Sequence, residues 1–158
     1  MKTTINFDGS HDWKTGNSTG GAVVRIAGKV HEFNWDFGVT TMQGCEFKAL
    51  TNAVIEAKKL GATELAIYGD SKLVVNICNR RWKAKLPHIR AYRNDLHEAI
   101  GGIRFKAYWI PREQNEHADR LAREVSLDKL SMPALAVYAE PVGVVTTDWL
   151  EDVAEFIS

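Results

Sequence analysis

The sequence has no uninterrupted apolar run approaching the length needed to cross a bilayer, and its amino terminus lacks a signal-peptide pattern. Cysteine is scarce: Cys45 and Cys78 are the only two, with no metal-ligand spacing around them. Both fall in segments with a helical pattern, so we interpret them as reduced structural residues. These absences predict a soluble, cytoplasmic protein with no membrane partner.

The chain also has no net charge, because 20 basic residues balance 20 acidic ones, but the two signs are unevenly distributed. Residues 127–158 contain six acidic residues against one lysine. A basic run without acidic residues extends from Lys72 to Arg93 and includes Trp82 and Tyr92. Such a run is often only a solvated face, yet cations interleaved with aromatics favour a nucleic-acid backbone as the partner.

The periodicity of apolar residues predicts a mixed α/β domain with a core of its own, since 45% of the 158 residues are apolar. Strands are predicted at residues 3–8, 22–26 and 33–39, joined by short links as in an antiparallel meander. Helical patterns then begin at Glu46, Ser71, Ile89 and Asn115, with strands at 64–70 and 103–110 between them. This order predicts a mixed sheet flanked by helices.

The stretch at residues 64–71 carries an acidic residue to the end of a buried strand. Four apolar residues are followed by Gly69 and Asp70, and Ser71 then offers an N-cap for the next helix. An ionised group at such a place is costly unless a cation meets it. Asp70 is therefore either a binding or catalytic group or merely part of the helix cap.

Three further carboxylates occupy comparable places. Asp8 lies at the end of the first strand, and Glu46 and Asp119 lie near the starts of helices expected to pack on the sheet. If the first and fourth strands are neighbours, Asp8 and Asp70 approach closely, because paired strands are about 4.8 Å apart. Clustered acids favour hard divalent cations such as Mg²⁺, and two ions about 4 Å apart promote phosphodiester hydrolysis. The alternative for any one acid is a cap or a surface charge.

Four short motifs resemble the acidic motifs of type 1 ribonuclease H, in that family's order and at its approximate spacings. They are Asp8-Gly9-Ser10, Thr40-Thr41 with Glu46, Gly69-Asp70-Ser71, and Asn115-Glu116-His117-Ala118-Asp119-Arg120-Leu121-Ala122. The likeness covers roughly residues 3–126. It implies a ribonuclease H-like fold, with a five-stranded mixed sheet flanked by helices on both sides, and cleavage of the RNA strand of RNA/DNA hybrids.

The resemblance also implies the roles of individual residues. The metal ligands and catalytic residues would be Asp8, Glu46, Asp70 and Asp119, holding two Mg²⁺ ions with Mn²⁺ as a substitute. Asn115 would assist the last acid and contact the substrate, and Thr41 would contact a phosphate of the DNA strand. Further expected contacts with the hybrid are Gly9, Ser10 and Gln43, which are placed to meet 2′-hydroxyls, and the basic residues Arg81, Lys83 and Lys85.

The loop after the last strand departs from the better-known bacterial members of the family. Residues 109–115 lack the mobile histidine of those members and resemble the archaeal and plant-type relatives. His117 lies on the following helix and is interpreted as a surface histidine. The basic segment at 80–90 is also shorter than the basic protrusion of some members.

We divide the chain into a catalytic domain, residues 1–126, and a C-terminal extension, residues 127–158. The end of the extension, residues 148–157, has the pattern of a short amphipathic helix. This helix either packs back on the domain or provides a contact with a partner or a second copy. We expect a monomer.

The sequence therefore predicts an RNA/DNA hybrid endoribonuclease that leaves 5′-phosphate and 3′-hydroxyl ends. One alternative is a non-catalytic hybrid-binding module, which would gain nothing from an acidic cluster facing phosphate. Another is a different nuclease of the same fold, such as a proofreading exonuclease or a junction resolvase. Such an exonuclease would need Asp-x-Glu in the first motif, where this chain has Asp8-Gly9-Ser10.

Overall fold

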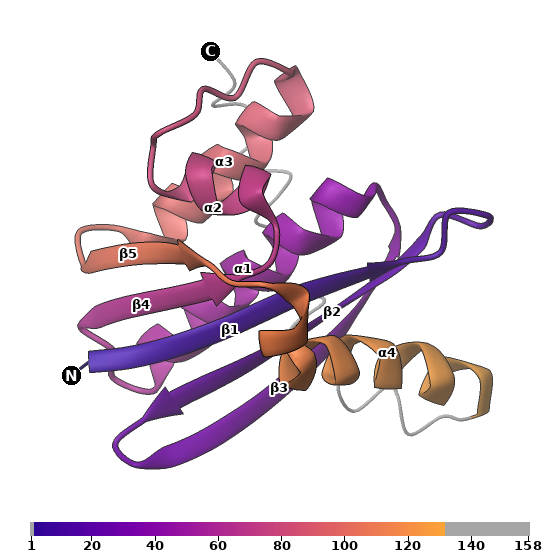
Figure 1. Ribbon diagram of the computed structural model, residues 1–158, viewed down its shortest axis with the longest axis horizontal. Helices are drawn as coiled ribbons and strands as arrows, with labels where there is room; N and C mark the ends of the chain where they lie inside the picture. The colour runs from indigo at the N-terminus through magenta and orange to yellow at the C-terminus, as the bar shows by residue number, and fades with distance from the viewer. Residues whose placement is uncertain (1, 132–158) are drawn as a thin grey trace.

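The computed structural model describes residues 2–131, with side chains described as far as residue 125. Five strands form one sheet in the order β3-β2-β1-β4-β5 (Figure 1). The strands are β1 (Lys2–His11), β2 (Asn17–Ile26), β3 (Lys29–Val39), β4 (Glu64–Gly69) and β5 (Arg104–Trp109). The first three pair antiparallel, whereas β4 runs parallel to both β1 and β5, so the predicted mixed sheet is confirmed.

Helices cover both faces of this sheet. One face carries α1 (Met42–Lys59), α2 (Lys72–Cys78) and α3 (Pro87–Ile100), and the other carries α4 (Glu116–Ser131), preceded by the 3₁₀ turn η1 (Arg112–Gln114) (Figure 1). The main core lies between the sheet and α1 to α3. Successive strand residues alternate between the two faces of the sheet, so every second residue of a strand points into this core. In β1, Ile5 and Phe7 enter this core, whereas Asn6 and Asp8 face the side of α4.

Side-chain hydrogen bonds attach α4 to the antiparallel half of the sheet. The Thr19 hydroxyl donates to the carbonyl of Ala122 at 2.7 Å, and the Asn34 amide donates to the carbonyl of Leu121 at 3.2 Å. The helix packs across β1, β2 and β3, and on this face the outer strand β5 leaves Lys106 exposed. Helix α4 is thus held over one half of the sheet.

Several predicted boundaries are wrong by three residues or more, namely the end of β1 and the starts of β2, β3 and α1. Helix α1 begins at Met42 rather than at Glu46, because the Thr41 side chain accepts from the backbone N–H of Gly44 and caps the helix earlier. Glu46 therefore lies in the second turn instead of the first. Strand β2 begins at Asn17 rather than at Ala22, because its first residues continue the ladder with β1.

No helix within residues 2–131 is long and apolar enough to cross a membrane. Helix α4 continues to Ser131, past the domain boundary expected at residue 126. The helix expected at residues 148–157 lies outside the described residues, so this part of the domain division stays a prediction.

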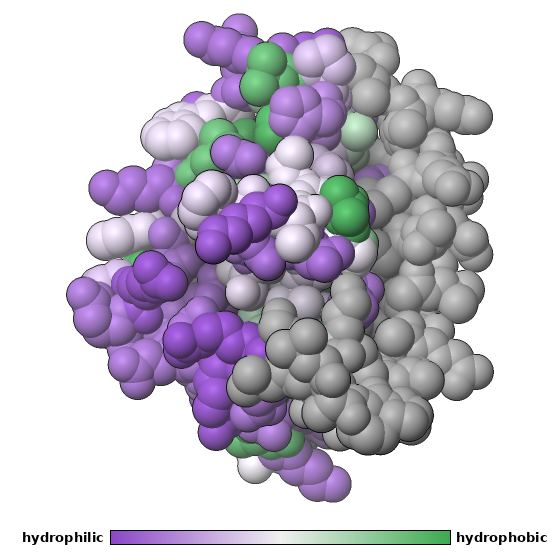
Figure 2. Space-filling view, turned by 90° about the vertical axis from the view of Figure 1, so that its right-hand side faces the viewer, coloured by the Kyte–Doolittle hydropathy of each residue, from purple (hydrophilic) through white to green (hydrophobic). Residues whose placement is uncertain are grey.

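The carboxyl ends of β1, β4 and β5 point to the right in Figure 1, and Figure 2 views the molecule from that side. Among the residues coloured there, hydrophilic ones predominate and hydrophobic ones form small separate patches. Trp13 in the β1–β2 loop is nevertheless 80% exposed. The described part of this edge is thus mainly polar, as a surface that meets a charged ligand must be.

Candidate active site

Three carboxylates from different elements meet at the carboxyl edge of the sheet. Asp8 lies in β1 and Asp70 directly follows β4, and the parallel pairing of these strands brings both to one edge. Glu46 reaches them from the second turn of α1. One oxygen from each of the three lies within 4.8 Å of the others. Asp8 and Glu46 are buried, whereas Asp70 is half-buried.

A glycine in β1 makes this approach of α1 possible. A Cβ atom on Gly9 would lie 2.6 Å from Sγ of Cys45 and 2.9 Å from the backbone nitrogen of Glu46. Real Cβ atoms do not come that close to backbone atoms, so a larger residue at position 9 would push α1 away from the sheet. Gly9 is therefore required for Glu46 to reach Asp8.

The fourth acid, Asp119, joins the site from α4 but is not one of the three mutually close carboxylates. Its side chain hydrogen-bonds with that of Asp8. Its Oδ2 atom also lies 2.6 Å from Nη2 of Arg123, one helical turn later. Asp119 thus borders the cluster and is paired with the positively charged side chain of Arg123.

Burial and mutual repulsion raise the pKa values of Asp8, Glu46 and Asp70. Burial first, and then the charge of Asp70 and the hydrogen bond that protonated Asp8 donates to Asp119, raise the pKa of Asp8 to about 9. Burial and the Asp70 charge raise the pKa of Glu46 to about 7. Burial also raises the pKa of Asp70, although the nearby charge of Arg112 opposes that rise. Asp8 and Glu46 therefore hold protons at pH values at which isolated carboxyls would be ionised.

This donor set fits a divalent cation. Closely spaced carboxylate oxygens are the ligands that hard ions such as Mg²⁺ take, and a bound cation would remove the repulsion that now holds the protons. The same cluster without a cation is expensive, because buried charges need a partner. The residues present thus fit a divalent metal site formed by Asp8, Glu46 and Asp70, with Asp119 beside it.

Asn115 connects the start of α4 to β1. Its amide nitrogen donates to the carbonyl of Phe7 at 2.8 Å, and its amide oxygen accepts from the side chain of Asn6 at 3.2 Å. Asn115 is 1% exposed, so substrate has little access to it. In this structure its contacts position Asp8 and Asp119 relative to each other, a role that the residue pattern alone did not reveal.

One helix cap lies five residues before Glu46, and another directly follows Asp70. The Thr41 hydroxyl accepts from the N–H of Gly44 at 2.9 Å, and the Ser71 hydroxyl accepts from the N–H of Val74 at 3.3 Å. Ser71 also hydrogen-bonds with Glu46, which lowers the pKa of that carboxyl somewhat. The side-chain cap of α2 is therefore Ser71 and not Asp70, which belongs to the acidic cluster.

The expected substrate-binding residues divide between two places. Gln43, Lys83 and Lys85 line one groove of about 560 Å³ between the start of α1, α2 and the segment before α3. Arg81 is exposed in the turn after α2. Ser10 is half-buried near the end of β1, beside the acids. The groove thus brings together side chains that are far apart in the sequence, and Lys83 and Lys85 form its basic rim.

Several neighbours of the site were not predicted. The charge of Arg112 lowers the pKa of Asp70, and the Trp109 indole N–H donates a hydrogen bond to the backbone carbonyl of Asp70 at 3.1 Å. The Arg123–Asp119 ion pair could have been predicted from the sequence, because Arg123 follows Asp119 by four residues, the spacing of ion pairs on a helix. His117 hydrogen-bonds with Glu32, away from the three-acid cluster.

Comparison with known proteins gives a family. A family model described as reverse transcriptase-like matches residues 6–125. The bifunctional protein Rv2228c of Mycobacterium tuberculosis is 36% identical over 152 residues, which are 94% of this chain and 41% of that protein. The chain thus spans about two-fifths of the length of this curated relative.

Solved structures give the same relationship. The N-terminal RNase H domain of Rv2228c has a TM-score of 0.74 and 35% identity, over 78% of this chain and 98% of that one. RNase H1 of the halophilic archaeon Halobacterium salinarum has a TM-score of 0.75 and 29% identity, covering 82% and 99%. LC11-RNase H1, solved in complex with an RNA/DNA hybrid, has a TM-score of 0.71 and 25% identity, covering 77% and 94%.

Proposed function

The chain belongs to the type 1 ribonuclease H family, and we propose that it is an endoribonuclease acting on the RNA strand of RNA/DNA hybrids. The observation that carries this proposal is the convergence of the Asp8, Glu46 and Asp70 carboxylates within 4.8 Å. In a protein that only bound nucleic acid, such an anionic cluster would lower the affinity, because the carboxylates would repel phosphate.

We assign the four acids, Asp119 included, to two Mg²⁺ ions, for which Mn²⁺ would substitute. When bound, these ions lower the pKa of a water molecule and stabilise negative charge on the leaving oxygen. The chain's own residues position the acids: Asn115 holds α4 against β1, Gly9 admits α1, and Arg112 opposes the accumulated negative charge. The products would be 5′-phosphate and 3′-hydroxyl ends.

The hybrid would lie across the polar edge and the groove whose rim carries Lys83 and Lys85. Lys83 and Lys85 on the groove rim supply cations for the DNA backbone, with Arg81 nearby, and Gln43 supplies a hydrogen-bonding group. Gly9 and Ser10 follow Asp8 in β1, where 2′-hydroxyls would distinguish RNA from DNA, and Thr41 at the start of α1 would contact a phosphate of the DNA strand. Because most of these contacts go to backbone and sugar, we expect weak sequence preference. A monomeric state and a cytoplasmic location stay predictions.

The test uses an end-labelled RNA/DNA hybrid beside RNA/RNA and DNA/DNA duplexes, each with Mg²⁺ and with chelator. We expect internal cleavage of the RNA in the hybrid alone, lost with chelator. Asp70→Asn should reduce the rate by about a thousandfold or more, since metal ligands contribute several kcal/mol. Glu124→Gln is the matched control, because it removes one partly exposed negative charge of α4 that pairs with Arg120.

Two results would contradict the proposal. A hybrid that is bound but left intact in both Mg²⁺ and Mn²⁺ would identify a binding module. Cleavage of the DNA duplex would identify another nuclease of the same fold.

A further inference from the structure

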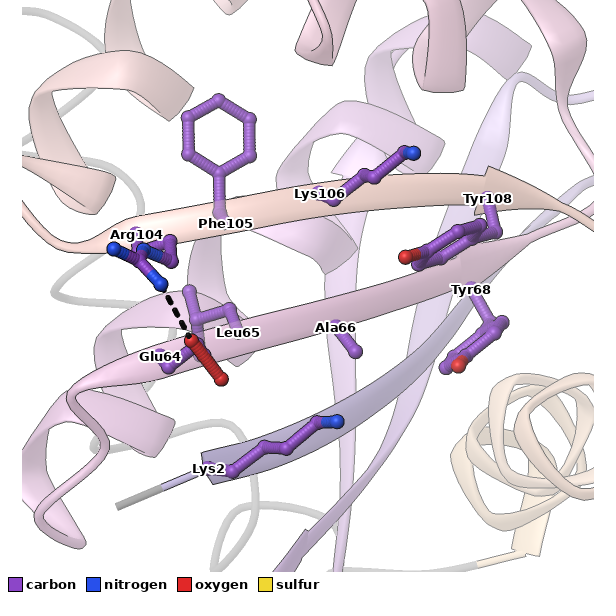
Figure 3. Close-up of a pocket in the computed structure, with 9 residues that line it drawn as sticks. All are labelled: Lys2, Glu64, Leu65, Ala66, Tyr68, Arg104, Phe105, Lys106 and Tyr108. Carbon is purple, nitrogen blue, oxygen red and sulfur yellow. Dashed lines mark ion pairs between the residues drawn. The ribbon is translucent and has the colours of Figure 1, made fainter.

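The face of β4 and β5 on the side of α4 carries a pocket away from the acidic cluster. Figure 3 shows this pocket, which has a volume of about 340 Å³ and crosses β1, β4 and β5. Helix α4 packs on β1, β2 and β3, so it covers the neighbouring half of the sheet. The pocket is therefore a sheet face bordered by a helix on one side.

Two stacked tyrosines form one end of the pocket. Tyr68 and Tyr108 are register partners on the parallel strands β4 and β5, and their ring centroids lie 5.2 Å apart with 19° between the ring planes. Figure 3 shows the rings roughly parallel, at the end of the pocket away from the Arg104–Glu64 ion pair. Tyr108 is 40% exposed although it is a large aromatic residue.

The rest of the pocket is predominantly basic. Lys2, Arg104 and Lys106 line it against one acid, Glu64, which pairs with Arg104 at 3.7 Å. The Lys106 ammonium lies 5.4 Å from the centroid of the Tyr108 ring. Cations beside exposed aromatic rings on a sheet match what single-stranded nucleic acids need, namely ring surfaces for bases and positive charges for phosphates.

We propose that this pocket binds single-stranded nucleic acid. The inference rests on the proposed function for the source of the strand, which is the unpaired continuation of a hybrid held at the acidic edge. Tyr68 precedes Asp70 by two residues in the same segment, so the pocket starts about 7 Å from that edge. A duplex is too stiff to turn from the edge onto the sheet face, whereas a single strand is flexible.

The first experiment measures binding by fluorescence anisotropy, with a labelled mixed-sequence DNA single strand of about ten nucleotides and chelator present. We expect Tyr108→Ala to weaken binding about fivefold or more, the effect of losing one base–aromatic contact. Tyr108→Phe should retain the affinity, because it keeps the ring. Lys106→Gln should weaken binding and reduce the salt dependence by about 0.7 in the slope of log K against log salt.

Lys29→Gln is the matched control for Lys106→Gln. Lys29 is an exposed lysine at the start of β3, the strand at the opposite edge of the sheet from β5. Its substitution removes the same charge without touching the pocket, so we expect single-strand affinity and its salt dependence to stay near the wild-type values.

The second experiment compares hydrolysis of a blunt RNA/DNA hybrid with that of the same hybrid carrying a single-stranded DNA extension. We expect Tyr108→Ala and Lys106→Gln to cleave the blunt hybrid at the wild-type rate. In the wild-type protein the single-stranded extension should lower the KM for the hybrid. In the two variants the extended and blunt hybrids should have the same KM. If the wild-type protein cleaves no hybrid, the proposed function fails, and the anisotropy measurement still decides the present proposal.

Three results would overturn the proposal. The first is a single-strand affinity that neither Tyr108→Ala nor Lys106→Gln changes. The second is a lowered melting temperature in both variants at unchanged affinity, which would mean that another part of the chain covers the pocket. The third is a change from dimer to monomer in sedimentation, which would identify a second copy of the chain as the occupant.

Discussion

Nη2 of Arg123 lies 2.6 Å from Oδ2 of Asp119, one helical turn earlier on α4, and so occupies an oxygen beside the acidic cluster. The Arg123 side chain is 64% exposed, whereas that of Asp119 is 12% exposed. An ion pair with one partner in solvent contributes only about 0.5 kcal/mol. The guanidinium is therefore a weak competitor for a cation at Asp119.

Arg123→Gln should raise the affinity for Mg²⁺ about twofold, because the competing positive charge is removed. Isothermal titration calorimetry measures this affinity. Arg120→Gln is the control, since Arg120 pairs with Glu32 and Glu124 and should leave metal affinity unchanged. A clear fall in affinity in Arg123→Gln would instead mean that Arg123 holds Asp119 in a binding position.

Metal binding should release protons. The pKa of Glu46 is raised to about 7 and that of Asp8 to about 9, so at pH 7 the metal-free cluster holds protons that a cation must displace. The affinity for Mg²⁺ should therefore rise between about pH 6 and pH 9. Titrations at pH 7 in two buffers of different ionisation enthalpy measure the release directly. Equal heats in both buffers would show that no proton leaves.

Much of the site was predictable because it depends on local patterns. Asp8 and Asp70 each follow apolar strand residues, and parallel strands bring their carboxyl ends to one edge. The helical spacing of Ala118, Leu121 and Ala122 likewise placed Asp119 beside an apolar stripe that packs on the sheet.

The rest depends on contacts that no local pattern encodes. Asn115 meets Asn6 and the carbonyl of Phe7, residues more than a hundred positions away in the chain. The early start of α1 depends on a cap at Thr41 that precedes the apolar stripe. The groove joins Gln43 with Lys83 and Lys85 only after α1 and α2 have packed together.

Asp95 should make stability depend on pH. It is 0% exposed, and neither carboxylate oxygen has a hydrogen-bond partner among the described residues. Burial, followed by the charge of Glu98, raises its pKa to about 8, against the opposing effect of Lys48. The folded state thus keeps a proton that the unfolded state releases above about pH 4. This contribution to stability is complete below about pH 4 and is lost as the pH rises to about 8.

Asp95→Asn replaces the carboxyl with a neutral group of the same shape. We expect the variant to match the wild-type protein near pH 4 and to exceed it at pH 8, by on the order of a few kcal/mol in the free energy of unfolding. Urea unfolding at several pH values, with chelator, measures the difference. Glu124→Gln, which removes an exposed charge, should leave the pH profile unchanged. An equally steep profile in Asp95→Asn would contradict the assignment.

Gly21 sets the distance between β2 and α4, because a Cβ there would lie 2.5 Å from the carbonyl oxygen of Ala118 and 2.6 Å from the nitrogen of Ala122. Both are backbone atoms, so Gly21→Ala must displace the helix that carries Asp119. We expect a loss of about 1–3 kcal/mol in stability, as for other overpacked sites. The displaced helix should also lower metal affinity and any hybrid cleavage.

Gly102→Ala is the control for this change, because no atom in the described part of the chain lies within 4 Å of a Cβ at that position. Its free energy of unfolding should stay within about 0.5 kcal/mol of the wild-type value. Chemical unfolding and Mg²⁺ titration of both variants separate the two effects of Gly21→Ala. A Gly21→Ala protein that is destabilised but binds Mg²⁺ with wild-type affinity would show that the metal site tolerates a shift of α4. Asp119 would then not be a ligand, and the metal would be held by Asp8, Glu46 and Asp70 alone.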